Sequence, residues 1–208
     1  MNFSTFFSKQ ARKPEGLFGR IVMRMVFDKG NVVLNNFVND LMSVQTDDRI
    51  LEIGCGTGKL INKMAIKIGN GLIEGIDFSS EMVSIARKRN KVNIAKEKVK
   101  ILEGNFDEIS YEKDCFTKAC SVNTLYFWPS PARTTKKLAE IIKPGGKLVL
   151  AFEDIEQLKR RNLNQDIFNL YSKDEVQDLL INAGFVNYVN TVSRKKGNLI
   201  FHCVVAIK

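Results

Sequence analysis

Residues 50–60 constrain the fold of this 208-residue chain more than any other segment. An apolar run ends in Glu52, and three glycines then alternate at positions Gly54, Gly56 and Gly58. Glycine adopts φ > 0 and has no Cβ, so a ligand can come close to the backbone N–H groups of such a turn. Residues with helical spacing follow the last glycine. The segment therefore predicts a strand, a glycine-rich turn that binds a ligand, and a helix.

The spacing of the glycines separates two classes of cofactor. A dinucleotide-binding fingerprint reads G-x-G-x-x-G/A, and its last small residue packs the helix against the strand. Here the third glycine comes one position early, and Lys59 stands where the small residue would be. The spacing therefore disfavours an oxidoreductase with a nucleotide cofactor.

Length and composition indicate a single globular domain over residues 1–208. The chain has 44% hydrophobic and 26% charged residues, which is typical of soluble proteins. It contains no run of the roughly 18 to 20 apolar residues that span a bilayer, and polar residues interrupt the Phe-rich start. Four cysteines, none at C-x-x-C spacing, and a single histidine make no zinc-binding set. We therefore expect a cytoplasmic protein without a bound metal.

Much of the net charge of +9 comes from one stretch of the sequence. Residues 87–100, called the basic segment below, hold seven lysines and arginines against one glutamate. Such a segment can attract nucleic acid or anionic lipid. It can also be a solvated helix end and linker, because basic residues suit a helix C-terminus. The segment lacks the aromatic residues that stack on unpaired bases, which favours the second interpretation.

Apolar periodicity predicts strands and helices in alternation after two N-terminal helices. The helices are expected at 17–28, 31–43, 58–68, 80–89, 130–142 and 173–182, and the strands at 49–53, 72–77, 98–103, 116–122, 147–152, 184–193 and 199–207. This order predicts a Rossmann-like three-layer α/β sandwich with a mostly parallel seven-stranded sheet. The final two strands read as a hairpin, which makes the last strand antiparallel.

Polar residues follow the predicted strands where ligands of such sheets bind, at the carboxyl ends. Asp77 ends the second strand, and its carboxylate can accept hydrogen bonds from both hydroxyls of a ribose. Asn105 follows the third strand, and Asn123 follows the fourth. These residues are therefore expected to meet the glycine turn at one edge of the sheet.

The pattern E-x-G-x-G-x-G of residues 52–58 resembles the first motif of class I S-adenosylmethionine (SAM)-dependent methyltransferases. The sequences at 78–82 and 142–148 are similar to later segments of the same family. The opening residues resemble the N-terminal cap of a group of small uncharacterised bacterial methyltransferases. The resemblance implies a helical cap at 1–45 over a Rossmann-like core at 46–208, with SAM as methyl donor and S-adenosylhomocysteine (SAH) as product.

The resemblance also implies which residues hold the cofactor and the acceptor. The cofactor set is Glu52, Gly54, Cys55, Gly56, Gly58, Asp77, Phe78, Met82, Asn105, Phe106 and Asn123, and the substrate set is Tyr126, Trp128 and Glu153. Asn105 stands where many relatives have Asp, and its carbonyl oxygen can still accept a hydrogen bond from the adenine amino group. Residues 123–126 lack the two prolines found in enzymes that methylate the exocyclic amines of bases.

These observations favour a methyltransferase that acts on a small molecule. Two alternatives remain: an RNA or protein methyltransferase that docks through the basic segment, and a SAM-binding module without activity. A general base is needed only when the acceptor must lose a proton. Tyr126, Glu153 and Asp154 come closest to the expected pocket, and no catalytic residue is assigned.

Overall fold

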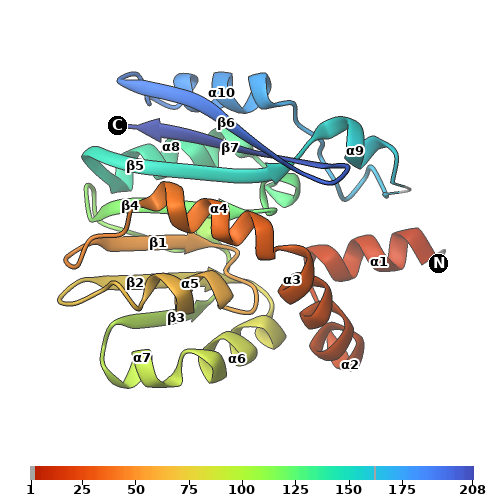
Figure 1. The fold of residues 1–208 in the computed structure, drawn as a ribbon, viewed down its shortest axis with the longest axis horizontal. Helices are drawn as coiled ribbons and strands as arrows, with labels where there is room; N and C mark the ends of the chain where they lie inside the picture. Colours follow the sequence, from red (N-terminus) through yellow and green to blue (C-terminus); the bar gives the residue numbers. More distant parts are fainter. Residues whose placement is uncertain (1–2, 162) are drawn as a thin grey trace.

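The computed structural model describes residues 3–161 and 163–208 and contains a seven-stranded sheet (Figure 1). The strands lie in the order β3-β2-β1-β4-β5-β7-β6. Neighbouring strands from β1 to β5 pair in parallel, and β7 pairs antiparallel with both β5 and β6. Their bounds are β1 Arg49–Ile53, β2 Leu72–Asp77, β3 Val99–Glu103, β4 Phe116–Val122, β5 Ile142–Glu153, β6 Tyr188–Lys196 and β7 Leu199–Ile207. The predicted α/β sandwich with an antiparallel last strand is confirmed.

Two apolar cores lie on the two faces of this sheet. In β1, Ile50 belongs to one core and Leu51 to the other, because successive side chains of a strand point to opposite faces. Helices α4 (Val32–Met42), α5 (Lys59–Met64), α6 (Ser80–Arg89) and α7 (Lys91–Ala95) cover the first face. Helices α8 (Pro131–Ile141), α9 (Ile155–Lys159) and α10 (Lys173–Asn182) cover the second.

The N-terminal helices divide into two groups. Helix α1 (Phe3–Arg12), helix α2 (Gly16–Phe18), the π-helical turn η1 (Gly19–Met23) and helix α3 (Arg24–Gly30) lie beyond the carboxyl ends of the parallel strands (Figure 1). Helix α4 instead packs on the sheet, where Leu34, Phe37 and Met42 are fully buried. Of the cap predicted for residues 1–45, we keep the name for α1 to α3 and the adjoining Asn31, because the apolar face of α4 completes the core.

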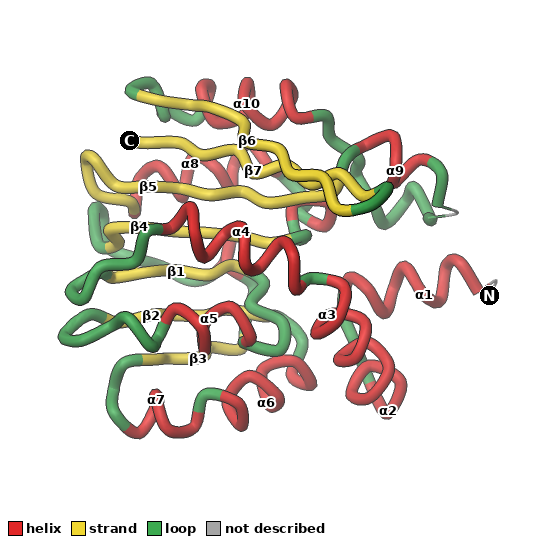
Figure 2. The backbone as a smooth tube through the Cα atoms, viewed as in Figure 1, coloured by secondary structure: helices red, strands yellow, loops and turns green. Residues whose placement is uncertain are grey.

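Most predicted elements are present, with differences at their ends (Figure 2). Helix α5 ends at Met64 rather than at residue 68. Strand β5 begins at Ile142 rather than at residue 147. Helices α1 and α7 were not predicted. Two short 3-10 turns, η2 (Phe106–Glu108) and η3 (Leu125–Phe127), follow β3 and β4.

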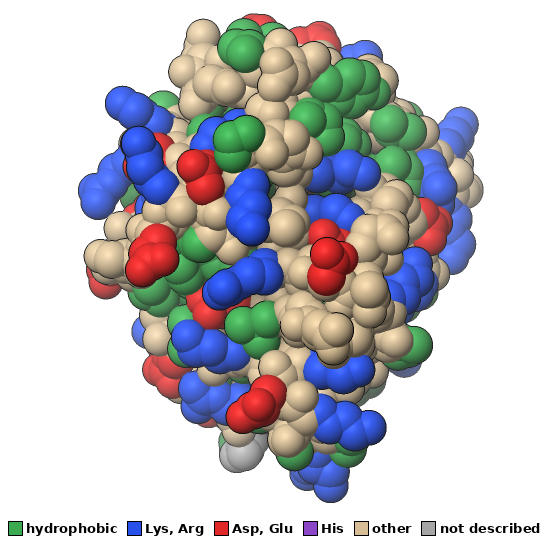
Figure 3. Space-filling model, turned by 90° about the vertical axis from the view of Figure 1, so that its left-hand side faces the viewer, with side chains coloured by type: hydrophobic (Ala, Val, Ile, Leu, Met, Phe, Trp, Pro, Cys, Tyr) green, Lys and Arg blue, Asp and Glu red, His purple; other side chains and the backbone are tan. Residues whose placement is uncertain are grey.

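On one face of the molecule, basic side chains are interspersed with acidic ones (Figure 3). Figure 3 shows this face, which lies at the amino ends of the parallel strands. Within the basic segment, four of the side chains bond to neighbouring elements. These contacts are Arg87 with the Ile101 carbonyl, Arg89 with Asp28, Lys98 with the Ile68 carbonyl, and Lys100 with Glu74. They agree with the structural interpretation of this segment.

No helix within residues 3–161 and 163–208 is long and apolar enough to cross a membrane. The same residues contain no cluster of metal-binding side chains. All four cysteines are free thiols, and three of them are buried.

Candidate functional site

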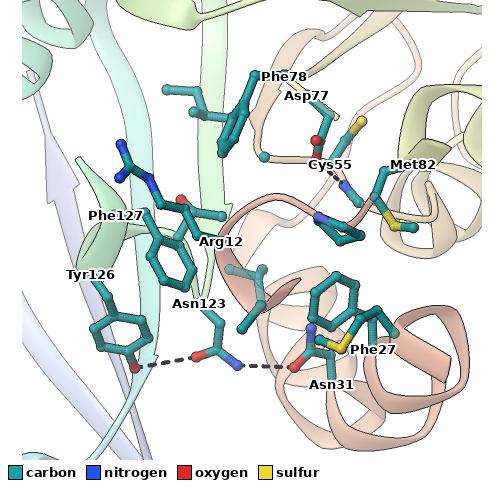
Figure 4. Close-up of a pocket in the computed structure, with 18 of the residues that line it drawn as sticks. Arg12, Phe27, Asn31, Cys55, Asp77, Phe78, Met82, Asn123, Tyr126 and Phe127 are labelled. Atoms are coloured by element: carbon teal, nitrogen blue, oxygen red, sulfur yellow. Dashed lines mark hydrogen bonds between the residues drawn. The ribbon is translucent and has the colours of Figure 1, made fainter. Parts of the chain in front are cut away.

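A large pocket lies where the cap meets the carboxyl ends of β1, β2, β4 and β5 (Figure 4). Its cavity measures about 470 Å³. The cap contributes Arg12, Phe27 and Asn31, and the sheet contributes the residues at its strand ends. The cap therefore covers one side of the pocket, although its residues are far in sequence from those at the strand ends.

The glycine turn after β1 forms the floor of the pocket. Gly54 and Gly56 have φ values of 67° and 51°, which L-residues with a Cβ rarely adopt. A Cβ on Gly54 would stand 2.3 Å from Cγ2 of Thr124, whereas one on Gly56 would project toward Phe27 across the pocket. Both positions therefore require glycine, Gly54 to pack and Gly56 to leave room for a ligand.

Asp77 ends β2 beside this turn, and its carboxylate accepts two backbone hydrogen bonds. One comes from the Gly56 N–H at 2.8 Å and the other from the Ser79 N–H at 2.9 Å. Burial raises the pKa of Asp77 to about 6, although these two donors lower it. The carboxylate is thus held in a fixed orientation at the pocket wall and keeps free lone pairs for a ligand.

Glu52 lies next to Asp77 and is 3% exposed. Its Oε2 has no hydrogen-bond partner among the described residues. Burial, followed by the nearby charge of Asp77, raises the pKa of Glu52 well above its usual range, and a hydrogen bond from the Ile61 backbone lowers it only in part. A buried acceptor without a partner is costly unless a ligand supplies a donor.

Asn123 connects the sheet to the cap. Its Nδ2 donates to Oδ1 of Asn31 at 2.9 Å, and its Oδ1 accepts from the Tyr126 hydroxyl at 3.4 Å (Figure 4). Asn123 itself has φ 56°, a conformation that Asn tolerates better than most residues. The side chain therefore spans the pocket from β4 to the start of α4.

The Tyr126 hydroxyl also accepts a hydrogen bond from the Glu153 backbone N–H at 2.7 Å. Burial raises the pKa of this phenol above its ordinary value. Tyr126 is therefore a neutral anchor and not a base at neutral pH. Its ring packs against Phe127 and Phe168, with centroid distances of 6.1 and 5.9 Å, and these rings form the apolar wall of the pocket.

The other two candidate bases, Glu153 and Asp154, already have hydrogen-bond partners within the protein. Both carboxylate oxygens of Glu153 bond to Arg161, with Oε1 3.2 Å from Nη1. Asp154 caps α9 and lies 3.0 Å from Nε2 of His202. Burial raises the pKa of Asp154, but the hydrogen bonds with His202 and with the Gln157 and Glu156 backbone N–H groups together outweigh burial, so the pKa is lowered. None of these groups is a free base facing the cavity.

The Asn105 side chain stabilises the turn after β3. Its Oδ1 accepts from the Asp107 N–H at 3.2 Å, and its Nδ2 donates to Glu108 at 3.0 Å. One lone pair of Oδ1 remains for a ligand. Phe78, Met82 and Phe106 line the same region of the pocket and make it apolar.

Thirteen of the fourteen residues predicted for the site line this one pocket, and Gly58 does not. A Cβ on Gly58 would come within 2.6 Å of Asn90 Nδ2 and 2.9 Å of Ala86 Cβ. Gly58 therefore allows α5 to pack closely on α6. Cys55 lines the pocket, but burial raises the pKa of its thiol well above the usual range, so it is not a nucleophile.

Several lining residues were not predicted from the sequence. They are Arg12, Phe27 and Asn31 from the cap, Asp107 from the turn after β3, and Phe168 from the segment after α9. Asp107 neighbours a predicted residue and could have been included for that reason. The others approach the site only through tertiary packing.

Comparison with known proteins agrees with this geometry. Residues 50–146 match the model of a methyltransferase domain. The methyltransferase YdaC of Bacillus subtilis is 26% identical over 126 residues, which are 61% of this chain and 67% of that protein. The crystal structure of a SAM-dependent methyltransferase from Aquifex aeolicus superimposes with a TM-score of 0.72 at 18% identity, over 91% of this chain and 98% of that one. The chain therefore has the fold of SAM-dependent methyltransferases, and its residues 50–146 are similar to a methyltransferase domain.

The match to other methyltransferases covers less of their length. The demethylmenaquinone methyltransferase of Lactococcus lactis is 30% identical over 132 residues, which are 59% of this chain but only 52% of that enzyme. The methyltransferase-domain model likewise matches only residues 50–146 of this chain.

Proposed function

We propose that this methyltransferase binds SAM in the pocket and transfers its methyl group to a small, largely apolar acceptor. The observation that carries the proposal is the pair of buried carboxylates at the glycine turn, Asp77 held by two N–H donors and Glu52 with an unpartnered oxygen. These acceptors fit a cofactor with two ribose hydroxyls and an ammonium group. Asp77 would hold the hydroxyls, and Glu52 would accept from the ammonium group.

The remaining predicted residues fit the rest of the cofactor. Gly54, Cys55 and Gly56 would lie against its amino-acid part, and Phe78, Met82 and Phe106 against its apolar surfaces. Asn105 would accept a hydrogen bond from the adenine amino group through the free lone pair of Oδ1. When bound, the cofactor supplies an activated methyl group, because the sulfonium is already a good leaving group.

The chain's own contribution is to position the acceptor and exclude water. The aromatic wall of Tyr126, Phe127 and Phe168 would pack against the acceptor, and Trp128 extends it. The acid and phenol groups nearby are already bonded within the protein. We therefore infer an acceptor that reacts without losing a proton to the enzyme in the rate-limiting step.

A small acceptor is favoured over RNA or protein. The pocket is closed by the cap, and much of the basic segment is used in internal contacts. The relative from Lactococcus lactis is named for demethylmenaquinone, which is consistent with a small-molecule acceptor. A cytoplasmic location fits the free cysteines.

Calorimetry of the purified protein with SAH, and with NAD in parallel, tests the proposal. We expect SAH to bind and NAD not to bind. The Asp77→Asn variant should bind SAH at least about tenfold more weakly, through loss of charge-assisted hydrogen bonds. The matched change Asp178→Asn, on the exposed side of α10, should leave the affinity unchanged. Absence of SAH binding by the folded wild type would refute the proposal.

A further inference from the structure

The cap carries an exposed apolar stripe. Its members are Leu17, Ile21, Val22, Met25 and Val26, and their exposed fractions are 76%, 56%, 38%, 53% and 40%. They recur at helical spacing through α2, η1 and α3, so they lie along one side of this helical segment. Exposed apolar residues scattered singly are ordinary, but a row of five on one segment of ten residues indicates a contact surface.

The opposite side of the same segment already supplies the apolar contacts of the fold. Met23 is fully buried, Phe27 lines the pocket, and the ring of Phe18 packs edge-on against Phe6 at 4.9 Å. The cap therefore does not need the stripe for its attachment to the core. A helix that is apolar on both sides has a second apolar partner.

The segments that carry and precede the stripe are rich in basic residues. Residues 1–30 contain six lysines and arginines against two acidic residues. One of these acids, Asp28, is bound by Arg89 of the core, and the other, Glu15, pairs with Lys13. Lys9, Arg12 and Lys29 are exposed, and none of them has an acidic partner among the described residues. The surface around the stripe therefore carries an excess of positive charge.

The stripe also reaches the pocket. Val26 belongs to both the stripe and the pocket lining, and Arg12 lines the pocket from α1. An apolar compound that entered from the side of the stripe would remain in contact with apolar side chains until it met the aromatic wall.

We propose that α1 to α3 form a docking surface for an anionic lipid bilayer. An apolar helical side with a basic border is the combination that binds at the lipid–water interface, with the apolar side chains among the acyl chains and the basic ones at anionic headgroups. A protein partner of matching shape would not require the unpaired positive charge. The pocket would then open toward the membrane surface. This surface is distinct from the cofactor site, and its function does not depend on the identity of the acceptor.

Sedimentation with vesicles tests the proposal on the full chain. We expect binding to vesicles of equal parts phosphatidylglycerol and phosphatidylcholine, weaker binding in higher salt, and little binding to phosphatidylcholine alone. The variant Leu17→Gln/Ile21→Gln/Met25→Gln should lower the partition coefficient at least about tenfold, because each change removes apolar surface while keeping a good helix former.

A matched control distinguishes vesicle binding by the stripe from nonspecific binding by any exposed apolar residues. Ile66, Val92 and Val186 are exposed by 81%, 56% and 76% and lie outside the cap. The triple change of these residues to Gln should leave vesicle binding unchanged. Equal binding by the stripe variant, or none by the wild type, would overturn the proposal. So would a dimer in sedimentation velocity that the stripe variant abolishes, since the stripe would then bind a second copy.

Calorimetry with SAH on the stripe variant keeps the two proposals apart. Retained SAH affinity together with lost vesicle binding supports the docking surface. Failure of the wild type to bind SAH concerns the cofactor site alone and does not affect the result with vesicles.

Discussion

The guanidinium of Arg89 holds the carboxylate of Asp28 through two hydrogen bonds, with Nη1 2.9 Å from Oδ1 and Nη2 2.5 Å from Oδ2. Arg89 ends α6, and Asp28 lies in α3, so the contact joins the core to the cap. The Thr57 hydroxyl of the glycine turn donates to Asp28 Oδ1 at 2.6 Å. Burial would raise the pKa of Asp28, but the hydrogen bonds from Arg89 and Thr57 outweigh it and lower the pKa. The position of α3 over the pocket depends on this ion pair.

Replacement of Arg89 by Ala should loosen the cap. The change leaves the Asp28 carboxylate without its guanidinium, and we expect the free energy of unfolding to fall by about 1 to 3 kcal/mol, since the pair is only partly exposed. Hydrogen exchange in residues 19–30 should accelerate. Lys159→Ala removes a largely exposed ion pair with Glu156 and should leave the free energy of unfolding nearly unchanged. Unchanged exchange in the Arg89 variant would show that α3 is held by other contacts.

The affinity for SAH should depend on pH through Asp77. Its pKa of about 6 means that the carboxyl group takes up a proton as the pH falls through 6 and then offers fewer lone pairs to ribose hydroxyls. We expect a constant affinity between pH 7 and 8 and a decline of up to about tenfold per pH unit below 6. Calorimetry from pH 5 to 8 measures this dependence. The Asp77→Asn variant should lack the transition near pH 6, and a flat wild-type profile would contradict the expectation.

Asp77→Asn should remove a pH dependence of stability while it weakens binding. The pKa of Asp77 rises from 3.8 to about 6 on folding, so its contribution to stability is greatest below pH 3.8 and is lost as the pH rises through 6. This loss amounts to roughly 3 kcal/mol. Asn is neutral throughout but offers one acceptor oxygen to the two N–H donors of Gly56 and Ser79, so the variant loses a hydrogen bond at every pH. The difference in free energy of unfolding between variant and wild type should therefore shift against the variant by about 2 to 3 kcal/mol from pH 7 to pH 4. Urea unfolding at both pH values checks this, and a difference that does not vary with pH would be evidence against a buried charge.

Gly54→Ala should destabilise the glycine turn for two separable reasons. The new Cβ would stand 2.3 Å from Cγ2 of Thr124, and φ is 67°. Gly145→Ala, where φ is 76° and nothing lies within 4 Å, measures the conformational cost alone, about 1 to 2 kcal/mol. Gly54→Ala should cost more than this control, and adding Thr124→Ser, which removes Cγ2, should restore part of the loss. Thermal unfolding of the three variants and the wild type gives the comparison, and no recovery in the double variant would show that the clash is not with Thr124.

Much of the sheet could be predicted because its strands are short apolar runs bounded by glycine, proline and polar residues. The bounds of β1, β2, β4 and β7 agree with the predicted ones. Helix α7, at Lys91–Ala95, was not predicted because it is a single short turn in a basic segment without apolar periodicity. Helix α1 was not predicted because its aromatic residues lie close together near the start of the chain. These rings pack on other parts of the cap, as the contact between Phe6 and Phe18 shows.

The site could be predicted where it depends on topology. Parallel strands bring their carboxyl ends to one edge, so Glu52, Asp77 and Asn123 had to approach one another. The cap contributions could not be obtained in this way, because the hydrogen bond between Asn123 and Asn31 joins residues 92 positions apart. Gly58 was predicted for the site but does not line the pocket. A motif match does not tell whether a glycine makes room for a ligand or for the packing of a helix.

The two buried carboxylates of Glu52 and Asp77 also link the lifetime of the protein to the supply of its cofactor. Both are destabilising when ionised in the free protein, and a bound ligand that donates to them offsets this cost. The free form consequently unfolds more often and is degraded more readily than the loaded form. A cell short of the methyl donor would then hold fewer copies of this enzyme, so its abundance would follow the metabolic state without any dedicated regulator.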